Sequence, residues 1–214
     1  MGTSAMNTNA IDFEWTWCTD GYELFAKTAN GRPVGIVAKS PHFRHYSPME
    51  NRELFVRFID CPANPDGMLS FCNRFGIPMG KGVANIPWRG KRVHEVSLDT
   101  LLSERKAMKR TFRLFKIGNR LNLINFWNAN DSPLALLRAH LREEPTGRLS
   151  MALMPPDLLR AMWLQLALYT CSGLELFRCQ RCSDPFFVGP GTKRRSTAQY
   201  CSRACKQAAF NSSR

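Results

Sequence analysis

The residues with the clearest chemistry are four cysteines near the C-terminal end of the chain. Cys179 and Cys182 form a C-x2-C pair, and Cys201 and Cys205 form a C-x3-C pair after an 18-residue linker. Each close pair of thiolates can occupy one edge of a tetrahedron, so two pairs joined by such a linker are typical of a structural zinc site. The spacing therefore predicts one Zn²⁺ bound by these four cysteines.

Three other interpretations of these cysteines are ordinary buried thiols, disulfide partners and a redox C-x-x-C motif. A disulfide framework is not expected in a chain without an export signal. A redox motif normally opens a helix after a strand in a larger βαβ unit, and a second cysteine pair favours metal.

The segments around the cysteines predict how the ligands are held. Residues 184–191 read as a short β segment ended by a Gly-Pro-Gly turn, and a second short strand is expected around Gln199-Tyr200. Ser202 can cap a helix that runs through Phe210, which places Cys205 in the first helical turn, where free amides and the helix dipole favour the thiolate. A knuckle, a hairpin and a helix that share one metal predict a treble-clef-like finger over residues 176–214.

Positive charge is concentrated in this finger. Residues 178–214 carry eight basic residues and one acid, so net +7 of the chain's +13 lies there. Some of this excess would stabilise the formal −2 charge of a Zn(Cys)4 centre, and a charged, solvated face is the plainer interpretation of the rest. The functional interpretation of this charge is a phosphate-binding surface. Its candidate contacts are Lys193, Arg194, Arg195, Arg203 and Lys206.

The rest of the chain predicts a body of the α+β class, mainly helical with an N-terminal β hairpin. The 214 residues, 44% of them hydrophobic, can form one domain plus a small module. Residues 22–27 face residues 34–39 across Asn30-Gly31, a good hairpin signal. The expected divisions are a β-hairpin region over 1–45, a helical domain over 46–175 and the finger over 176–214.

Apolar residues at helical spacing predict the helices of the body. The expected helices cover residues 54–59, 68–75, 97–115, 121–127, 132–144 and 157–169. The glycine-rich stretch from Gly76 to Gly90 is expected to be a connector, and 148–154 a β arm. Only five residues separate Gly173, which should close the last helix, from Cys179, so finger and body are expected to pack together.

Membrane and enzyme functions find little support. No apolar run is long enough to span a bilayer and no signal pattern precedes the body, which predicts a cytoplasmic protein. Four thiolates close the coordination sphere of zinc, whereas a catalytic zinc keeps an open position. His94-Glu95 lacks the second histidine of an HExxH motif, and no GxSxG elbow is present, so we expect no enzyme activity.

Several segments carry a resemblance to known proteins. They are 46–58, 69–76, 156–165 and the cysteine finger. In this order they resemble uncharacterised bacterial proteins that pair a helical domain with a C-terminal zinc finger. The arrangement is similar to the ABATE plus CGNR zinc-finger proteins, which are regarded as stress-linked transcription regulators.

One departure concerns the residues after the last cysteine pair. Cys205 is followed by Lys206-Gln207 rather than by Gly-Asn-Arg. In that detail the finger is closer to small bacterial treble clefs such as the gyrase-inhibitor zinc protein, which act on a protein partner. The sequence thus predicts a nucleic-acid-binding regulator that contacts DNA, with a zinc-stabilised protein-interaction module as the alternative, and it indicates no oligomeric state.

Overall fold

The computed structural model describes residues 13–26, 31–79, 84–88, 91–93, 95–129, 132–143, 146–192 and 194–212. The described part is an α+β fold, as predicted. Its helices are α1 (Leu54–Asp60), α2 (Pro65–Phe75), α3 (Leu98–Lys116), α4 (Arg120–Asn128), α5 (Leu158–Cys171) and α6 (Arg203–Ser212). Its strands are β1 (Trp15–Cys18), β2 (Tyr22–Phe25), β3 (Gly35–Ala38), β4 (Phe43–Tyr46), β5 (Ala84–Trp88), β6 (Lys91–Val93), β7 (Glu95–Ser97), β8 (Arg138–Glu143), β9 (Leu149–Met154), β10 (Glu175–Arg178) and β11 (Pro185–Val188).

The N-terminal strands form two small antiparallel sheets. Strands β2 and β3 pair from Tyr22↔Ala38 to Phe25↔Gly35, which confirms the predicted hairpin; residues 27–30 of its turn lie outside the described part. Strand β7 adds to β3, and β1 pairs with β4. The strand β7 ends at Ser97, immediately before α3, and the Ser97 side chain makes no capping hydrogen bond.

Helix α5 is the central helix of the body. Nine of its fourteen residues are buried, and they lie all around the helix, as expected for a helix enclosed by other elements. Gln165 is buried on α5, where its amide accepts from Phe55 N and donates to the carbonyls of Pro48 and Asn51. Gly173 follows with a φ of 68°, so a left-handed residue closes the helix as predicted.

The predicted helix over 132–144 is wrong. Ser132 begins a turn there, with its Oγ accepting from Leu134 N, but the chain then continues as β8, which pairs with β9 from Arg138↔Met154 to Glu143↔Leu149. The local helix-start signal was real for one turn only. The long antiparallel partner, β9, supplies hydrogen bonds that a helix at this position could not make with it.

The stretch from Gly76 to Gly90 also differs from the expected connector. The strand β5 lies within this stretch and pairs with β6, which follows the stretch directly. This pairing depends on strand neighbours that turn residues alone do not predict.

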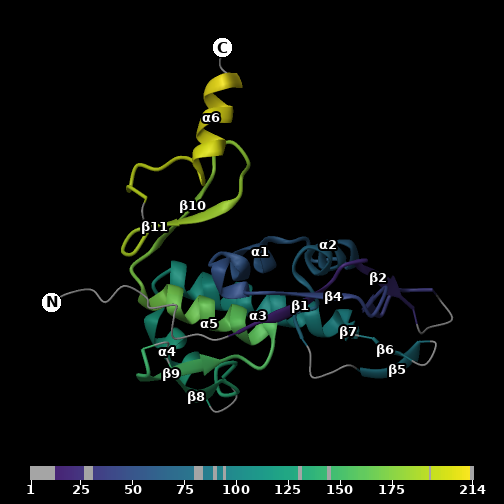
Figure 1. Ribbon diagram of the computed structural model, residues 1–214. Helices are drawn as coiled ribbons and strands as arrows, with labels where there is room; N and C mark the ends of the chain where they lie inside the picture. The colour runs from purple at the N-terminus through teal and green to yellow at the C-terminus, as the bar shows by residue number, and fades with distance from the viewer. Residues whose placement is uncertain are drawn as a thin grey trace.

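The finger packs onto the body, as predicted. Strands β10 and β11 rise from the α1 and α5 side of the body, and α6 lies at the far end of the finger (Figure 1). The main hydrophobic core is shared: it extends from Phe13 through α1, α2, α3 and α5 to Phe187 on β11.

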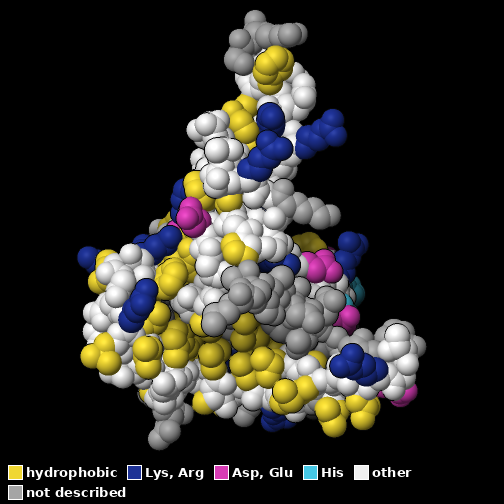
Figure 2. All heavy atoms as spheres, turned by 90° about the vertical axis from the view of Figure 1, so that its left-hand side faces the viewer, with side chains coloured by type: hydrophobic (Ala, Val, Ile, Leu, Met, Phe, Trp, Pro, Cys, Tyr) yellow, Lys and Arg dark blue, Asp and Glu magenta, His cyan; other side chains and the backbone are white. Residues whose placement is uncertain are grey.

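Apolar side chains are exposed on one face of the body. Figure 2 shows a band of hydrophobic side chains across the lower part of that face, and Lys and Arg side chains on the finger above it. Several large apolar residues of α4, β8 and β9 are more than half exposed: Leu121, Ile124, Leu141, Leu149 and Met151. No helix of the described residues is both long enough and apolar enough to cross a membrane.

Candidate metal centre

The four predicted cysteines come together in the finger. Their Sγ atoms all lie within 4.8 Å of one another. The Sγ atoms of Cys182 and Cys201 are 3.5 Å apart, those of Cys201 and Cys205 3.5 Å, and those of Cys205 and Cys182 3.7 Å. Four sulfurs about 2.3 Å from a tetrahedral Zn²⁺ would be about 3.8 Å apart. The cluster therefore has the dimensions of a site for one metal ion.

The first cysteine pair lies in the turn that joins β10 to β11. The knuckle is closed by hydrogen bonds from Cys179 N to Asp184 O (3.0 Å) and from Ser183 N to Cys179 O (2.9 Å). Ser183 has a positive φ of 60°, which lets the chain reverse tightly enough to enter β11. The two strands pair from Glu175↔Val188 to Arg178↔Pro185, so the hairpin holds both ends of the knuckle.

The second pair is held by the start of α6. Ser202 Oγ accepts from Cys205 N at 3.1 Å, so Ser202 caps the helix as predicted and Cys205 lies in its first turn. The strand expected around Gln199-Tyr200 is wrong: this segment has no strand pairing and contacts the knuckle through one backbone bond, from Gln180 N to Gln199 O. That bond brings the second pair onto the first.

Hydrogen bonding decides which sulfur carries negative charge before a metal binds. Burial acts to raise the pKa of Cys179, but backbone N–H donors of Cys201, Cys182 and Arg181 outweigh it and lower the pKa to about 6. Burial and hydrogen bonds with the other thiols raise the pKa of Cys201 to about 12. Cys179 therefore loses its proton more readily than Cys201, and a bound divalent cation would displace the proton of Cys201.

A small apolar cluster supports the cysteines from within the finger. Cys179, Phe186 and Val188 are buried in it. Arg194 closes this cluster: its guanidinium lies 5.1 Å from the centroid of the Phe186 ring and donates to Phe187 O (3.2 Å) and Cys201 O (2.7 Å). Arg194 therefore ties the linker to β11 and to the second cysteine pair.

The other face of β11 anchors the finger to the body. Phe187 points away from Phe186, as alternation along a strand requires, and lies 5.0 Å from the Tyr169 ring and 6.2 Å from the Phe55 ring, measured between centroids. Beside it, Arg57 of α1 donates to Asp184 at 2.8 Å and holds the pKa of that carboxyl below its ordinary value. These contacts give the metal centre a fixed position on the body.

The predicted nucleic-acid contacts differ in how exposed their side chains are. Arg195, Arg203 and Lys206 are exposed, whereas Arg194 is partly buried in the contacts given above. Lys193 lies outside the described residues. Arg203 and Lys206 line one pocket with two aromatic residues, Tyr200 and Phe210, that the sequence analysis did not single out. The signal for Phe210 was the i, i+3, i+7 spacing of Arg203, Lys206 and Phe210 on one helix, whereas Tyr200 precedes the helix and gave no such signal.

Neither a family model nor a curated protein matches the sequence.

Proposed function

We propose that this protein is a bacterial transcription regulator that binds DNA through its C-terminal finger, and that the finger is held by one structural Zn²⁺. Four thiolates suit zinc and leave no position for a substrate, so we assign the metal no catalytic role. We also propose that the protein acts in a reducing cytoplasm, where thiols stay available as metal ligands.

The observation that carries the proposal is the uncompensated positive charge on the finger. Arg195, Arg203 and Lys206 are exposed around α6, and the sequence from 185 to 214 contains no acid. The one acid of the finger's charged stretch, Asp184, is paired with Arg57 of the body. Cations that no neighbouring acid neutralises attract phosphates, and each phosphate contact releases condensed counterions.

The test is binding of a labelled random-sequence DNA duplex by the zinc-loaded chain, measured by fluorescence anisotropy at several salt concentrations. We expect affinity that falls steeply with salt. In the double variant Arg203→Gln/Lys206→Gln, the slope of log K against log salt should become shallower by about 1.8, because each lost phosphate contact removes about 0.9.

The matched control removes the same charge from the body. Lys106 and Lys109 are exposed on α3, and Lys106→Gln/Lys109→Gln lowers the net charge equally. An equal loss of affinity in both double variants would refute a DNA surface on the finger. Point substitutions are preferable to truncation here, because removing the finger would also remove Phe187 from the core of the body.

Protein binding is the second candidate function, and the exposed apolar residues of α4, β8 and β9 favour it. Monomeric proteins rarely leave a large contiguous apolar patch in water. If the full chain binds neither a duplex nor a single strand even at low salt, despite its net charge of +13, the DNA proposal fails and this candidate takes its place.

A further inference from the structure

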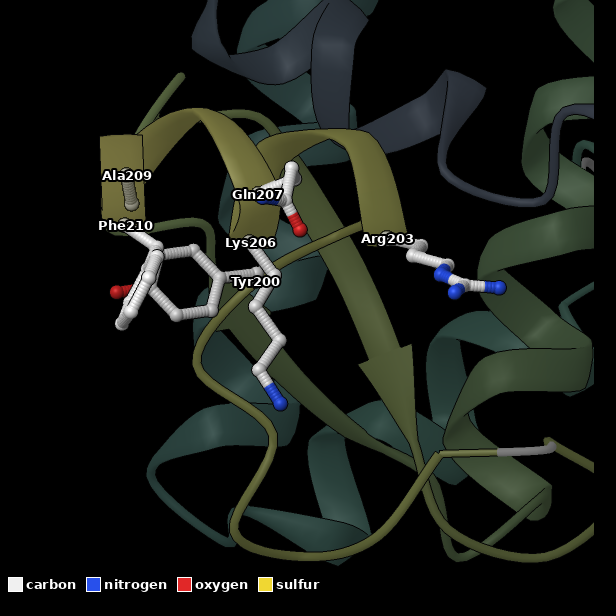
Figure 3. Close-up of a pocket in the computed structure, with 6 residues that line it drawn as sticks. All are labelled: Tyr200, Arg203, Lys206, Gln207, Ala209 and Phe210. Atoms are coloured by element: carbon white, nitrogen blue, oxygen red, sulfur yellow. The ribbon is translucent and has the colours of Figure 1, made fainter. Parts of the chain in front are cut away.

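A pocket with aromatic and basic walls lies on the outer side of the finger. Its volume is about 640 Å³, and it is lined by Tyr200, Arg203, Lys206, Gln207, Ala209 and Phe210. Tyr200 and Phe210 stand together at one end, the Lys206 side chain hangs between them and Arg203, and the Arg203 guanidinium points to the opposite side (Figure 3). This volume falls within the range of about 300–1,000 Å³ that is usual for small-ligand pockets.

The pocket continues into a second hollow. That hollow has a volume of about 470 Å³ and shares Tyr200, Arg203 and Lys206 with the first. It also reaches Arg195, so basic side chains line the two hollows from α6 back to the linker. The two hollows together form a groove with positive charge along its length; Tyr200 lines both hollows, and Phe210 lines the first.

Phe210 is the residue that a phosphate-binding surface does not explain. It is 58% exposed and shares its pocket with Arg203, Lys206 and Gln207. Tyr200, which lines the same pocket, packs against the small core around Cys179. An exposed ring beside cations suits a ligand that has both flat apolar faces and negative charge, and nucleic-acid bases on their backbone have both.

A duplex and a single strand differ in whether their base faces can contact the side chains of such a groove. In a duplex the base faces are stacked on one another and cannot reach an aromatic side chain, whereas in a single strand they are free to stack. Resting on the proposed function, we infer that the groove of the finger binds single-stranded nucleic acid, with one unpaired base stacked on Phe210 and Tyr200 and the flanking phosphates on Arg203, Lys206 and Arg195.

This inference predicts an order of affinities that charge alone would reverse. A duplex has the higher charge density, so a purely electrostatic surface binds it more tightly than a single strand at the same salt. We expect the zinc-loaded full chain to bind a labelled mixed-sequence strand of about twelve nucleotides more tightly than the matching duplex, a length within the usual range for one binding module. A DNA and an RNA strand of the same sequence, run in parallel, distinguish the natural polymer.

Substitutions separate stacking from charge. Phe210→Leu keeps an apolar side chain but removes the ring, and should weaken single-strand binding about fivefold or more with the salt slope and duplex binding unchanged. Phe210→Trp should restore the affinity. Leu149→Ala changes an exposed apolar residue of β9, far from the finger, and should have no effect. Metal content per chain, measured for every variant, shows that the finger remains folded.

The outcomes distinguish this inference from the proposed function. Tighter single-strand binding that is lost in Phe210→Leu and regained in Phe210→Trp supports it. A duplex bound at least as tightly, with Phe210→Leu unchanged, overturns the stacking site but leaves a DNA-binding finger. Binding of neither polymer overturns both.

Discussion

Cys182 is the most exposed of the four clustered thiols, yet the site depends on it. Cys179 is buried and Cys201 and Cys205 are half-buried, whereas Cys182 lies at the surface of the knuckle. Its Sγ is within 3.7 Å of both sulfurs of the second pair. Exposure does not make it dispensable, because a tetrahedral ion needs all four corners.

We therefore predict that Cys182→Ser loses most of its bound zinc and unfolds α6, while the body keeps its helices. The free energy of zinc binding, on the order of 10 kcal/mol for such sites, is also folding free energy of the finger. Metal analysis gives the zinc per chain, and hydrogen exchange reports on α6. Cys171→Ser, an exposed cysteine outside the cluster, is the control and should keep its zinc. Unchanged zinc in Cys182→Ser would contradict the four-ligand site.

At the scale of the element, the start of α5 depends on one side chain. Asp157 Oδ1 accepts from Arg160 N at 2.8 Å, which caps the helix, and its Oδ2 lies 3.6 Å from Arg160 Nη1. The side chain is only 11% exposed, and burial raises the pKa of the carboxyl. The capping hydrogen bond stabilises the helix, but burial of the ionised carboxylate lowers the stability of the folded state.

Asp157→Ala should lower the free energy of unfolding by about 1 kcal/mol, because the cap is lost. Asp157→Asn keeps an acceptor oxygen and should cost less at neutral pH. Because the carboxyl binds its proton more tightly in the folded state, the wild-type protein should lose stability relative to Asp157→Asn as pH rises through the raised pKa. Urea denaturation of the three proteins at acidic and neutral pH measures both effects. The cap argument fails if alanine and asparagine are equivalent.

At the scale of the whole molecule, two ion pairs among the described residues join the finger to α1. They differ in burial and therefore in how much they stabilise the contact. In the first, the Arg57 side chain is 17% exposed, and its Nε has no hydrogen-bond partner among the described residues. In the second, between Arg178 and Asp60, the arginine side chain is 55% exposed. A surface pair contributes little, whereas a buried cation that loses its partner is costly.

Asp184→Ala should therefore lower the free energy of unfolding by about 1–3 kcal/mol, since it strands the Arg57 guanidinium. Asp60→Ala should cost less than about 1 kcal/mol, because water can solvate Arg178. Chemical denaturation followed by the fluorescence of buried Trp163 compares the two variants. Equal costs would mean that the buried pair does not hold the finger to the body.

The parts of this protein that the sequence alone determined are those set by short-range spacing. The cysteine pairs, the Ser202 cap and the helices through Leu54, Leu101 and Leu159 follow from residues within one or two turns of each other. The β2–β3 hairpin is also local, because a short turn joins its strands. In each case the interacting groups are already close along the chain, so little of the outcome depends on the rest of the fold.

Only the tertiary structure decided the features that depend on distant partners. Residues 138–143 became a strand because β9 offered a full row of hydrogen bonds, and Arg194 turned inward because Phe186 and two carbonyls lay within its reach. Phe186 and Phe187 are neighbours in sequence, yet one supports the metal centre and the other fills the body core. Their assignment required knowing what lies on each side of β11. Local spacing says which groups can act together, whereas burial and pairing between distant segments decide which of them are free to do so.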